Sequence, residues 1–192
     1  MPDDMYWSWR GKRYAREFVD MPDGMAADFH RQENIIIDEI AKLEGVRYAM
    51  EVGCGFGRVA NALTNVFPCM YVSGFDPSLD QVLEARLRQC TSASGSFYQS
   101  DWHMLERLYR RFDLVYSVEV LMHIRDPWPV MRSMLLASKR YVLHCELDDG
   151  LGRSRRNYRH DYAGIYRSHG IPARIAAAAP FGQLITVAER PQ

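Results

Sequence analysis

Three glycines at alternate positions, Gly53, Gly55 and Gly57, stand between a run typical of a buried strand and a run typical of a helix. The strand-like run ends in the acidic residue Glu51, and apolar residues return at helical spacing from Val59 onward. Glycine adopts backbone conformations that other residues avoid, and it leaves no side chain in the way of a ligand. A strand that enters a helix through such a turn is typical of an open α/β sheet that holds a nucleotide-like cofactor at the carboxyl ends of its strands.

Strand-like and helix-like runs alternate through most of the chain. We expect strands over 47–52, 71–76, 96–99, 112–117 and 141–146, and helices over 26–43, 58–66, 78–87 and 130–137. The helix over 78–87 carries an apolar face made of Leu79, Val82, Leu83 and Leu87. Strands that alternate with helices in this way are typical of a parallel sheet covered on both faces.

The C-terminal part of the chain breaks this alternation. Two strand-like runs, 173–179 and 184–189, are joined only by Pro180–Gln183. So short a link fits an antiparallel hairpin and cannot hold a crossover helix. The predicted fold class is therefore α/β: a Rossmann-like, doubly wound, mostly parallel seven-stranded sheet with an antiparallel C-terminal hairpin.

Composition narrows the class of protein further. The chain has 192 residues, enough for one α/β domain, and its 24 basic residues balance its 24 acidic residues. Nucleic acid is therefore disfavoured as a partner, because no overall positive charge attracts phosphate. The first residues show no signal-peptide pattern, and no apolar run approaches the ~20 residues that span a bilayer. We expect a cytoplasmic protein with no membrane partner.

The cysteines give no sign of a metal site or of a disulfide framework. The four of them, Cys54, Cys69, Cys90 and Cys145, lie far apart and form no C-x-x-C pair. That spacing disfavours structural zinc, so we expect no metal.

Two acidic residues follow the second and third predicted strands. Asp76 ends the second strand, where a carboxylate can accept two hydrogen bonds from a ribose diol; the alternative is a helix N-cap with Pro77 at the first helical position. Asp101 and Trp102 follow the third strand, where they can accept from an adenine amino group and cover the ring; the alternative is an N-cap and a core aromatic. A dinucleotide is disfavoured, because Arg58 stands where the fingerprint G-x-G-x-x-G has its third glycine.

The order of these motifs resembles that of class I S-adenosylmethionine-dependent methyltransferases. The resemblance covers roughly residues 34–146 and rests on Glu51–Gly57, Gly74–Ser78, Ser100–Asp101, Phe112–Ser117 and Val120–Ile124. It implies the cofactor S-adenosyl-L-methionine, with S-adenosyl-L-homocysteine as the product. It also implies a division into an N-terminal lid or cap segment, 1–33, and a cofactor-binding methyltransferase domain, 34–192. A looser similarity links 120–124 and 138–143 with small methylases of sugar and nucleotide-sugar pathways.

The resemblance implies a role for each cofactor-binding position. Glu51 would organise the site near the methionine amino group, and Asp76 would hold the ribose hydroxyls. The glycine turn would lie along the cofactor backbone, with adenine at Asp101 and the sulfonium above a floor that begins at Ser117. The implied cofactor-binding set is Glu51, Gly53, Cys54, Gly55, Gly57, Asp76, Pro77, Asp101, Trp102, Ser117 and Val118.

Methyl transfer requires little beyond the alignment of the methyl group with the acceptor atom. Methyl transfer from a sulfonium is an in-line displacement, and a general base is needed only for a hydroxyl or a protonated amine. The candidates past the fourth and fifth strands are His123, Glu119 and His144. Each has an alternative: His123 can bond nearby backbone, Glu119 can orient an amine or cap a helix, and His144 can form a buried polar pair with Glu146.

Two basic segments are candidates for the acceptor pocket. The aromatic-basic stretch 6–18 can fold over the cofactor as a lid, or it can form an ordinary packing helix. The segment 153–159 carries four arginines, which suit a phosphate or carboxylate, or it can form a solvated loop. We expect methylation of an oxygen or nitrogen atom of a small molecule, which these arginines would allow to be anionic.

Two other functions stay open at this point. RNA or protein methylation would use the arginine-rich segment 153–159, with Trp7 and Trp9 as a docking surface. A non-catalytic cofactor-binding partner subunit would keep the cofactor motifs without turnover. The balanced charge argues against the first, and nothing in the motifs indicates a loss of activity.

Overall fold

The computed structural model describes residues 6–7, 10–11, 13–14, 17–18, 20–89, 95–147 and 157–190. Its centre is one sheet of seven strands in the order β3-β2-β1-β4-β5-β7-β6. The strands are β1 Tyr48–Val52, β2 Tyr71–Asp76, β3 Phe97–Gln99, β4 Phe112–Val118, β5 Ser138–Leu147, β6 Ala173–Ala179 and β7 Gln183–Glu189. The first five are parallel, whereas β7 pairs antiparallel with both β5 and β6. The predicted fold class, including the antiparallel C-terminal hairpin, is confirmed.

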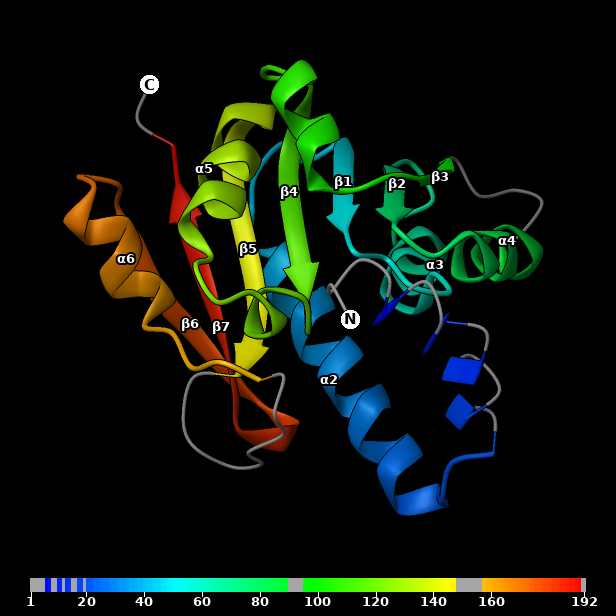
Figure 1. The fold of residues 1–192 in the computed structure, drawn as a ribbon. Helices are drawn as coiled ribbons and strands as arrows, with labels where there is room; N and C mark the ends of the chain where they lie inside the picture. Colours follow the sequence, from blue (N-terminus) through cyan, green and yellow to red (C-terminus); the bar gives the residue numbers. More distant parts are fainter. Residues whose placement is uncertain are drawn as a thin grey trace.

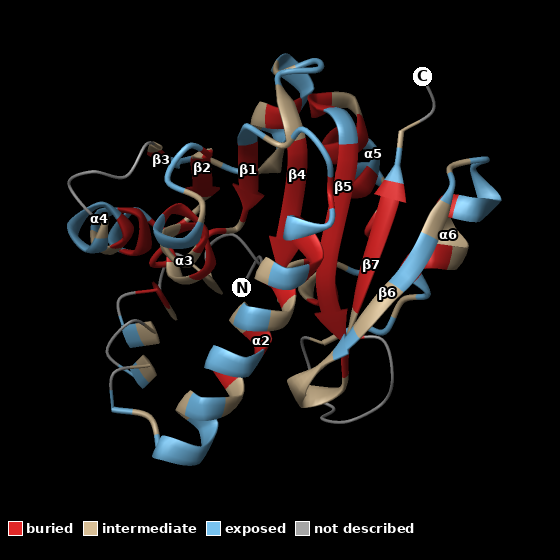
Figure 2. Ribbon diagram, turned by 180° about the vertical axis from the view of Figure 1, so that it is seen from behind, coloured by how far each residue is buried: buried red, intermediate tan, exposed pale blue. Residues whose placement is uncertain are grey.

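Helices cover both faces of this sheet (Figure 1). They are α2 Asp23–Ala41, α3 Arg58–Val66, α4 Leu79–Arg88, α5 Trp128–Ala137 and α6 Tyr162–Ser168, with short 3-10 turns η1 Trp102–Arg107, η2 Leu121–His123 and η3 Pro180–Gly182. One apolar core joins α2, α3 and α4 to the sheet, and a second joins η1, α5 and α6 to its other face. The strands between the two cores are the most deeply buried part of the molecule, while β6 forms a largely exposed edge (Figure 2).

Most predicted elements appear within a few residues of their expected ends. The four apolar residues that define the expected helical period are all buried: Phe29, Ile36 and Ile40 lie in α2, and Leu43 follows its end. This helix also runs without a break across positions 33 and 34, where the expected lid segment ends and the expected methyltransferase domain begins. The helix α6 and the turn η1 were not expected, because their short apolar patterns lie in stretches rich in polar residues.

The apolar face expected on the helix over 78–87 does not face the core. Only Val82 of its four residues is buried; Leu79 and Leu83 are each 46% exposed and Leu87 is 81% exposed. The buried side of α4 consists of Gln81, Val82 and Ala85 instead. A Cβ on Gly57 would lie 3.0 Å from the Ala85 Cβ, so α4 packs closely on the glycine turn through its smallest side chains. Helical period located the helix correctly but its buried face wrongly.

The carboxyl ends of the parallel strands meet the N-terminal segment, whose described residues between 6 and 18 are helical (Figure 1). The strand order reverses between β1 and β4, so the two flanking crossovers leave in opposite directions. Such a switch point at the carboxyl edge is where open α/β sheets bind ligands. The glycine turn lies there, at the end of β1.

Candidate active site

The glycine turn is held by one backbone hydrogen bond to the neighbouring strand β2 and by another within the turn. Gly53, Gly55 and Gly57 all have positive φ angles, of 66°, 53° and 77°. The Cys54 N–H donates to the Phe75 carbonyl at 2.9 Å, and the Gly57 N–H donates back to the Cys54 carbonyl at 2.9 Å. The turn therefore has one tight conformation that glycine alone adopts without strain.

The three glycines differ in what surrounds them. A Cβ on Gly53 would lie 2.5 Å from a methyl group of Val120, and one on Gly57 would lie 2.9 Å from the Asn61 amide nitrogen. Among the described residues, a Cβ on Gly55 would meet only the Gln81 Oε1 atom, at 3.4 Å. Internal packing thus explains the first and third glycines, whereas Gly55 leaves bare backbone beside open space. That is the place where the turn fits a nucleoside.

Asp76 connects the glycine turn to the start of α4. Its Oδ2 accepts the Gly55 N–H at 3.0 Å, and its Oδ1 accepts the Ser78 N–H at 2.8 Å. Burial raises the pKa of Asp76, and these two hydrogen bonds oppose that rise. A carboxylate has about four acceptor positions, so two remain for hydroxyl donors. The N-cap of α4 is Ser78, which leaves Asp76 as the residue that positions the turn.

Glu51 is buried between three elements. Its Oε2 accepts hydrogen bonds from the Ala60 N–H in α3 and from the Tyr116 hydroxyl in β4, each at 3.1 Å. Burial raises the pKa of Glu51 to about 8, and Arg58 acts against this rise. The carboxyl group therefore ties the end of β1 to the helix that follows the turn.

Asp101 and Trp102 lie at the start of η1, on the far side of β2 from the turn. The Asp101 Oδ1 accepts the His103 N–H at 2.9 Å, as the N-cap alternative requires. The Trp102 ring stacks on His103 at 3.8 Å between centroids and packs partly against the second core. Asp101 is exposed, so its carboxylate also stays open to a ligand.

At the end of β4 the chain brings Glu119 to the carboxyl edge in a strained conformation. Its φ angle is 59°, which a residue with a side chain rarely adopts and which is typical of functional sites. The Gln183 amide donates to its Oε1 at 2.6 Å, and Gln32 and Arg58 continue this chain of hydrogen bonds into α2 and α3. The sequence analysis missed Gln183 and Gln32, since nothing in local spacing connects residues 151 positions apart.

His123 and the N-terminal segment come together above this edge. The Trp7 ring lies 4.5 Å from the His123 ring, and the Tyr14 ring lies 6.1 Å from Phe56 of the glycine turn. Burial and the nearby Glu119 charge raise the pKa of Tyr14 to about 12. Aromatic side chains of the segment therefore lie against both the cofactor turn and the candidate base. Trp9 and the arginines at 153–156 lie outside the described residues.

His144 lies in a buried hydrogen-bonded row that starts at Ser117, whose side chain has no exposed surface. The Ser117 hydroxyl donates to Glu146 Oε1 at 2.8 Å, so its oxygen accepts from His144 Nδ1, 2.9 Å away; the other ring nitrogen then accepts from the Tyr166 hydroxyl. Burial lowers the pKa of His144 to about 3, so the ring is neutral. Val118, the next residue of β4, is also buried.

Glu146 holds the loop that carries the candidate bases. Its two oxygens accept the backbone N–H groups of Val120 and Met122, at 3.1 and 3.2 Å. Burial raises the pKa of Glu146 to about 7, against these hydrogen bonds. The expected pair of His144 and Glu146 exists, with Ser117 between its members, and the carboxyl group positions the segment between Glu119 and His123.

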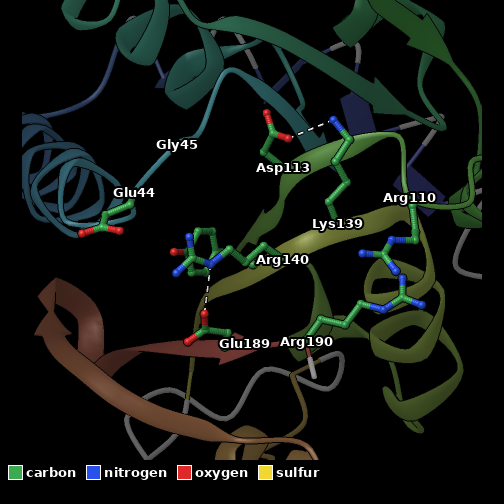
Figure 3. A pocket seen from close by; sticks show the side chains of 9 residues that line it. Glu44, Gly45, Arg110, Asp113, Lys139, Arg140, Glu189 and Arg190 are labelled. Atoms are coloured by element: carbon green, nitrogen blue, oxygen red, sulfur yellow. Dashed lines mark hydrogen bonds and ion pairs between the residues drawn. The ribbon is translucent and has the colours of Figure 1, made fainter. Parts of the chain in front are cut away.

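A cavity of about 430 Å³ lies at the opposite edge of the sheet (Figure 3). Its lining comes from the amino ends of the parallel strands and includes the ion pairs Lys139–Asp113, at 2.9 Å, and Arg140–Glu189, at 3.0 Å. It does not touch the glycine turn. The described part of the chain contains no cluster of His, Cys, Asp and Glu side chains that could hold a metal ion, and no helix there is long and apolar enough to span a membrane.

The sheet order and the glycine turn define a nucleotide-binding α/β protein, and comparison with known proteins makes the class specific. Residues 50–139 match the family model described as a methyltransferase domain. The structure superposes on magnesium protoporphyrin IX methyltransferase from Synechocystis PCC 6803 with bound S-adenosylmethionine, with a TM-score of 0.73 and 17% identity over 100% of this chain and 98% of that one. It also superposes on the DhpI complex with S-adenosylhomocysteine, with a TM-score of 0.65 and 20% identity over 98% and 96% of the two chains. Residues 50–139 therefore match a methyltransferase domain, and the chain has the fold of S-adenosylmethionine-dependent methyltransferases.

Within this class, one sequence relative is similar over part of its length. The chain is 33% identical over 99 residues to the ubiquinone biosynthesis O-methyltransferase of Pseudomonas paraeruginosa. The match includes 50% of this chain and 41% of the relative, so it spans about two-fifths of that protein.

Proposed function

We propose that this chain transfers the methyl group of S-adenosylmethionine to an oxygen or nitrogen atom of a small molecule. The observation that carries the proposal is the carboxyl edge itself. Bare backbone at Gly55 and the hydrogen-bonded carboxylate of Asp76 lie on one side, while Glu119 and His123 lie on the other. Aromatic residues of the N-terminal segment contact both sides, which favours a small acceptor over a macromolecule.

Each residue at this edge has a proposed task. The turn 53–57 holds the cofactor backbone, Asp76 and Pro77 the ribose, Asp101 and Trp102 the adenine, and Ser117 and Val118 form the floor. Glu51 positions the turn through its bonds to α3 and β4. The bound sulfonium would supply the methyl group, and the segment over the edge would exclude water from it.

The candidate bases take different tasks in this proposal. His123 faces the covered edge and is the base for a hydroxyl acceptor, whereas the Glu119 carboxylate is placed to orient an amine. His144 is a positioning residue, because both of its ring nitrogens are engaged inside the fold and it has no exposed surface. The partial similarity to an O-methyltransferase supports oxygen as the acceptor atom.

Titration of the full chain with S-adenosylhomocysteine tests the cofactor site. We expect Asp76→Ala to weaken binding by about a hundredfold, since it removes the acceptor for the ribose diol and releases the Gly55 N–H. Asp80→Ala, on the exposed side of the same helix, is the matched control and should bind as the native protein does. Equal affinities of the two variants would refute the assignment of the site.

The acceptor is tested separately with purified protein, S-adenosylmethionine and paired small molecules that differ only in a hydroxyl or an amino group. His123→Gln should abolish methylation of a hydroxyl acceptor at constant affinity for the cofactor. Methyl transfer to RNA or protein with none to the small-molecule panel would overturn the proposed acceptor class.

A further inference from the structure

Gln81 is a buried amide that the cofactor motifs did not single out. It lies in the first turn of α4 and is only 3% exposed. Its side-chain Nε2 donates to the Gly11 carbonyl of the N-terminal segment, whereas its Oε1 is buried without a hydrogen-bond partner among the described residues. The opposite amide orientation would place oxygen against the Gly11 oxygen, so Oε1 must be the unpartnered atom.

The unpartnered oxygen faces the part of the glycine turn that has open space. A Cβ on Gly55 would approach it at 3.4 Å and would meet no other atom of the described residues within 4 Å. The Gly55 N–H donates to Asp76, so this acceptor lies beside the carboxylate proposed to hold the ribose. A buried acceptor without a donor costs free energy, and such an atom in a native fold calls for a ligand or water that supplies the donor.

The other end of the same amide holds the segment that covers the site. A Cβ on Gly11 would lie 2.1 Å from Ser78 Oγ and 2.8 Å from Ser78 Cβ, so only glycine allows the segment to lie this close to α4. From there the segment reaches Phe56 through Tyr14 and His123 through Trp7. One side chain therefore contacts both the turn and its cover.

We propose that Gln81 couples cofactor binding to closure of the N-terminal segment. Its Oε1 accepts a hydrogen bond from a donor group of the bound adenosine, and its Nε2 then holds the Gly11 carbonyl. The donor removes the cost of burying Oε1, so closure is favoured when the site is filled; because coupling is reciprocal, closure tightens cofactor binding by the same factor. The inference rests on the proposed function and adds a sensor residue to it.

A double-mutant cycle on the full chain tests the coupling, with S-adenosylhomocysteine as the probe. Gln81→Met keeps the side-chain length but removes both polar atoms. Gly11→Ala lifts the segment, because its Cβ would lie 2.1 Å from Ser78 Oγ and 3.0 Å from Gln81 Cγ, and it keeps the Gln81 amide group. We expect each single variant to bind the probe about tenfold more weakly than the native protein does. The double variant should also bind about tenfold more weakly, because both substitutions break the same coupling. Gly24→Ala, where a Cβ meets no described residue within 4 Å, should bind as the native protein does.

Hydrogen exchange provides a second readout that does not depend on activity. Addition of S-adenosylhomocysteine should slow amide exchange around Gly11 and Tyr14 in the native protein but not in Gln81→Met. Additive losses of about a hundredfold in the double variant, or undiminished protection in Gln81→Met, would overturn the proposal.

Ligand analogues identify the donor and need no substitution. The probes are S-adenosylhomocysteine analogues that lack the 2′-hydroxyl, the 3′-hydroxyl or the adenine amino group. The analogue without the donor should bind the native protein weakly, leave Gly11 unprotected, and bind Gln81→Met as well as the parent compound does. The inference fails if each of the three analogues binds more weakly than the parent compound by the same factor in the native protein and in Gln81→Met. In that case Oε1 bonds a buried water.

The proposed function fails in a different way. It fails if the native protein does not bind S-adenosylhomocysteine or if Asp76→Ala binds it unchanged. Native binding that depends on Asp76 but is indifferent to Gln81 refutes only the coupling.

Discussion

The two edges of the sheet carry similar charged side chains, which are exposed at the amino edge and buried at the carboxyl edge. At the amino edge an open cavity exposes charged residues that pair with one another, such as Arg140 with Glu189. At the carboxyl edge the carboxyls of Glu51 and Glu146 are buried, and they bond backbone N–H groups and hydroxyls. The cavity is therefore at the edge that lacks the candidate site residues.

Burial accounts for this difference. The pKa of Glu51 is raised to about 8 and that of Glu146 to about 7, because burial removes water from both carboxyls. Burial alone would also raise the pKa of Asp113 at the amino edge, but hydrogen bonds from Lys139 and from two backbone N–H groups lower it. The two carboxyls that position the glycine turn and the loop of candidate bases are buried, whereas the charged groups at the amino edge stay in contact with water.

The largest expected contrast between the edges is in folding stability. Glu146→Ala leaves the N–H groups of Val120 and Met122 and the Ser117 hydroxyl buried without an acceptor, so the free energy of unfolding should fall by about 3 kcal/mol. Glu44→Ala, in the lining of the amino-edge cavity, should change it by less than about 0.5 kcal/mol. Urea unfolding measures both, and similar losses would show that the carboxyl edge is not the more tightly built one.

Two glycines with positive φ angles separate the effect of backbone strain from that of ligand contact. Gly55 and Gly45 have φ angles of 53° and 76°, so alanine at either position should cost about 1 kcal/mol of stability. Only at Gly55, on the carboxyl edge, would the new Cβ point into the cofactor site, and affinity for S-adenosylhomocysteine should fall by about thirtyfold there. Calorimetric titration checks this, and weaker binding by Gly45→Ala would contradict it.

The pH dependence of stability should have opposite signs at the two edges. The folded pKa of Glu51 lies above the ~4.3 of an unfolded glutamate, so its contribution to stability is full below about pH 4 and is lost as pH rises through about 8. The folded pKa of Asp113 is lowered, so its contribution is present above about pH 4 and is lost as pH falls. In the amide variant Asp113→Asn, the midpoint of thermal unfolding should therefore fall less steeply at acid pH than it does in the native protein.

The matching change at the carboxyl edge is Glu51→Gln. It should flatten the fall of the thermal unfolding midpoint between about pH 5 and 8, where one proton corresponds to at most ~1.4 kcal/mol per pH unit. A profile identical to that of the native protein would mean that Glu51 titrates at its ordinary value.

The smallest effect belongs to the ion pair at the amino edge. Arg140 and Glu189 are both about half exposed, so a double-mutant cycle with alanine at each should give a small coupling energy that shrinks in added salt. A large coupling energy that does not change with salt would place this pair among the buried networks and contradict the contrast between the edges.

Local sequence patterns predicted the glycine turn and the strands and helices around it. The turn 53–57 follows from glycine spacing, because each of its glycines has a positive φ angle. Strand and helix periods located the sheet and its C-terminal hairpin, since burial on one face or two imposes those periods. Asp76 was found because its place at the end of β2 depends only on the strand before it.

Tertiary packing decided what local patterns could not. The buried face of α4 proved to be Gln81 and Ala85 rather than the leucines, because close contact with Gly57 admits only small side chains there. The row that ends at Glu119 joins residues as far apart as Gln32 and Gln183. No local period records such a contact.

By itself, the sequence determined the type of sheet, the glycine turn and the cofactor class, since each depends on the conformational demands of neighbouring residues. Only the tertiary structure decided which carboxyls are buried, that His144 lies inside the fold, and that the Gln81 amide lies between the turn and the N-terminal segment. Burial and pairing arise between segments that are distant in the chain. For that reason the pKa values and the coupling across the site belong to the fold.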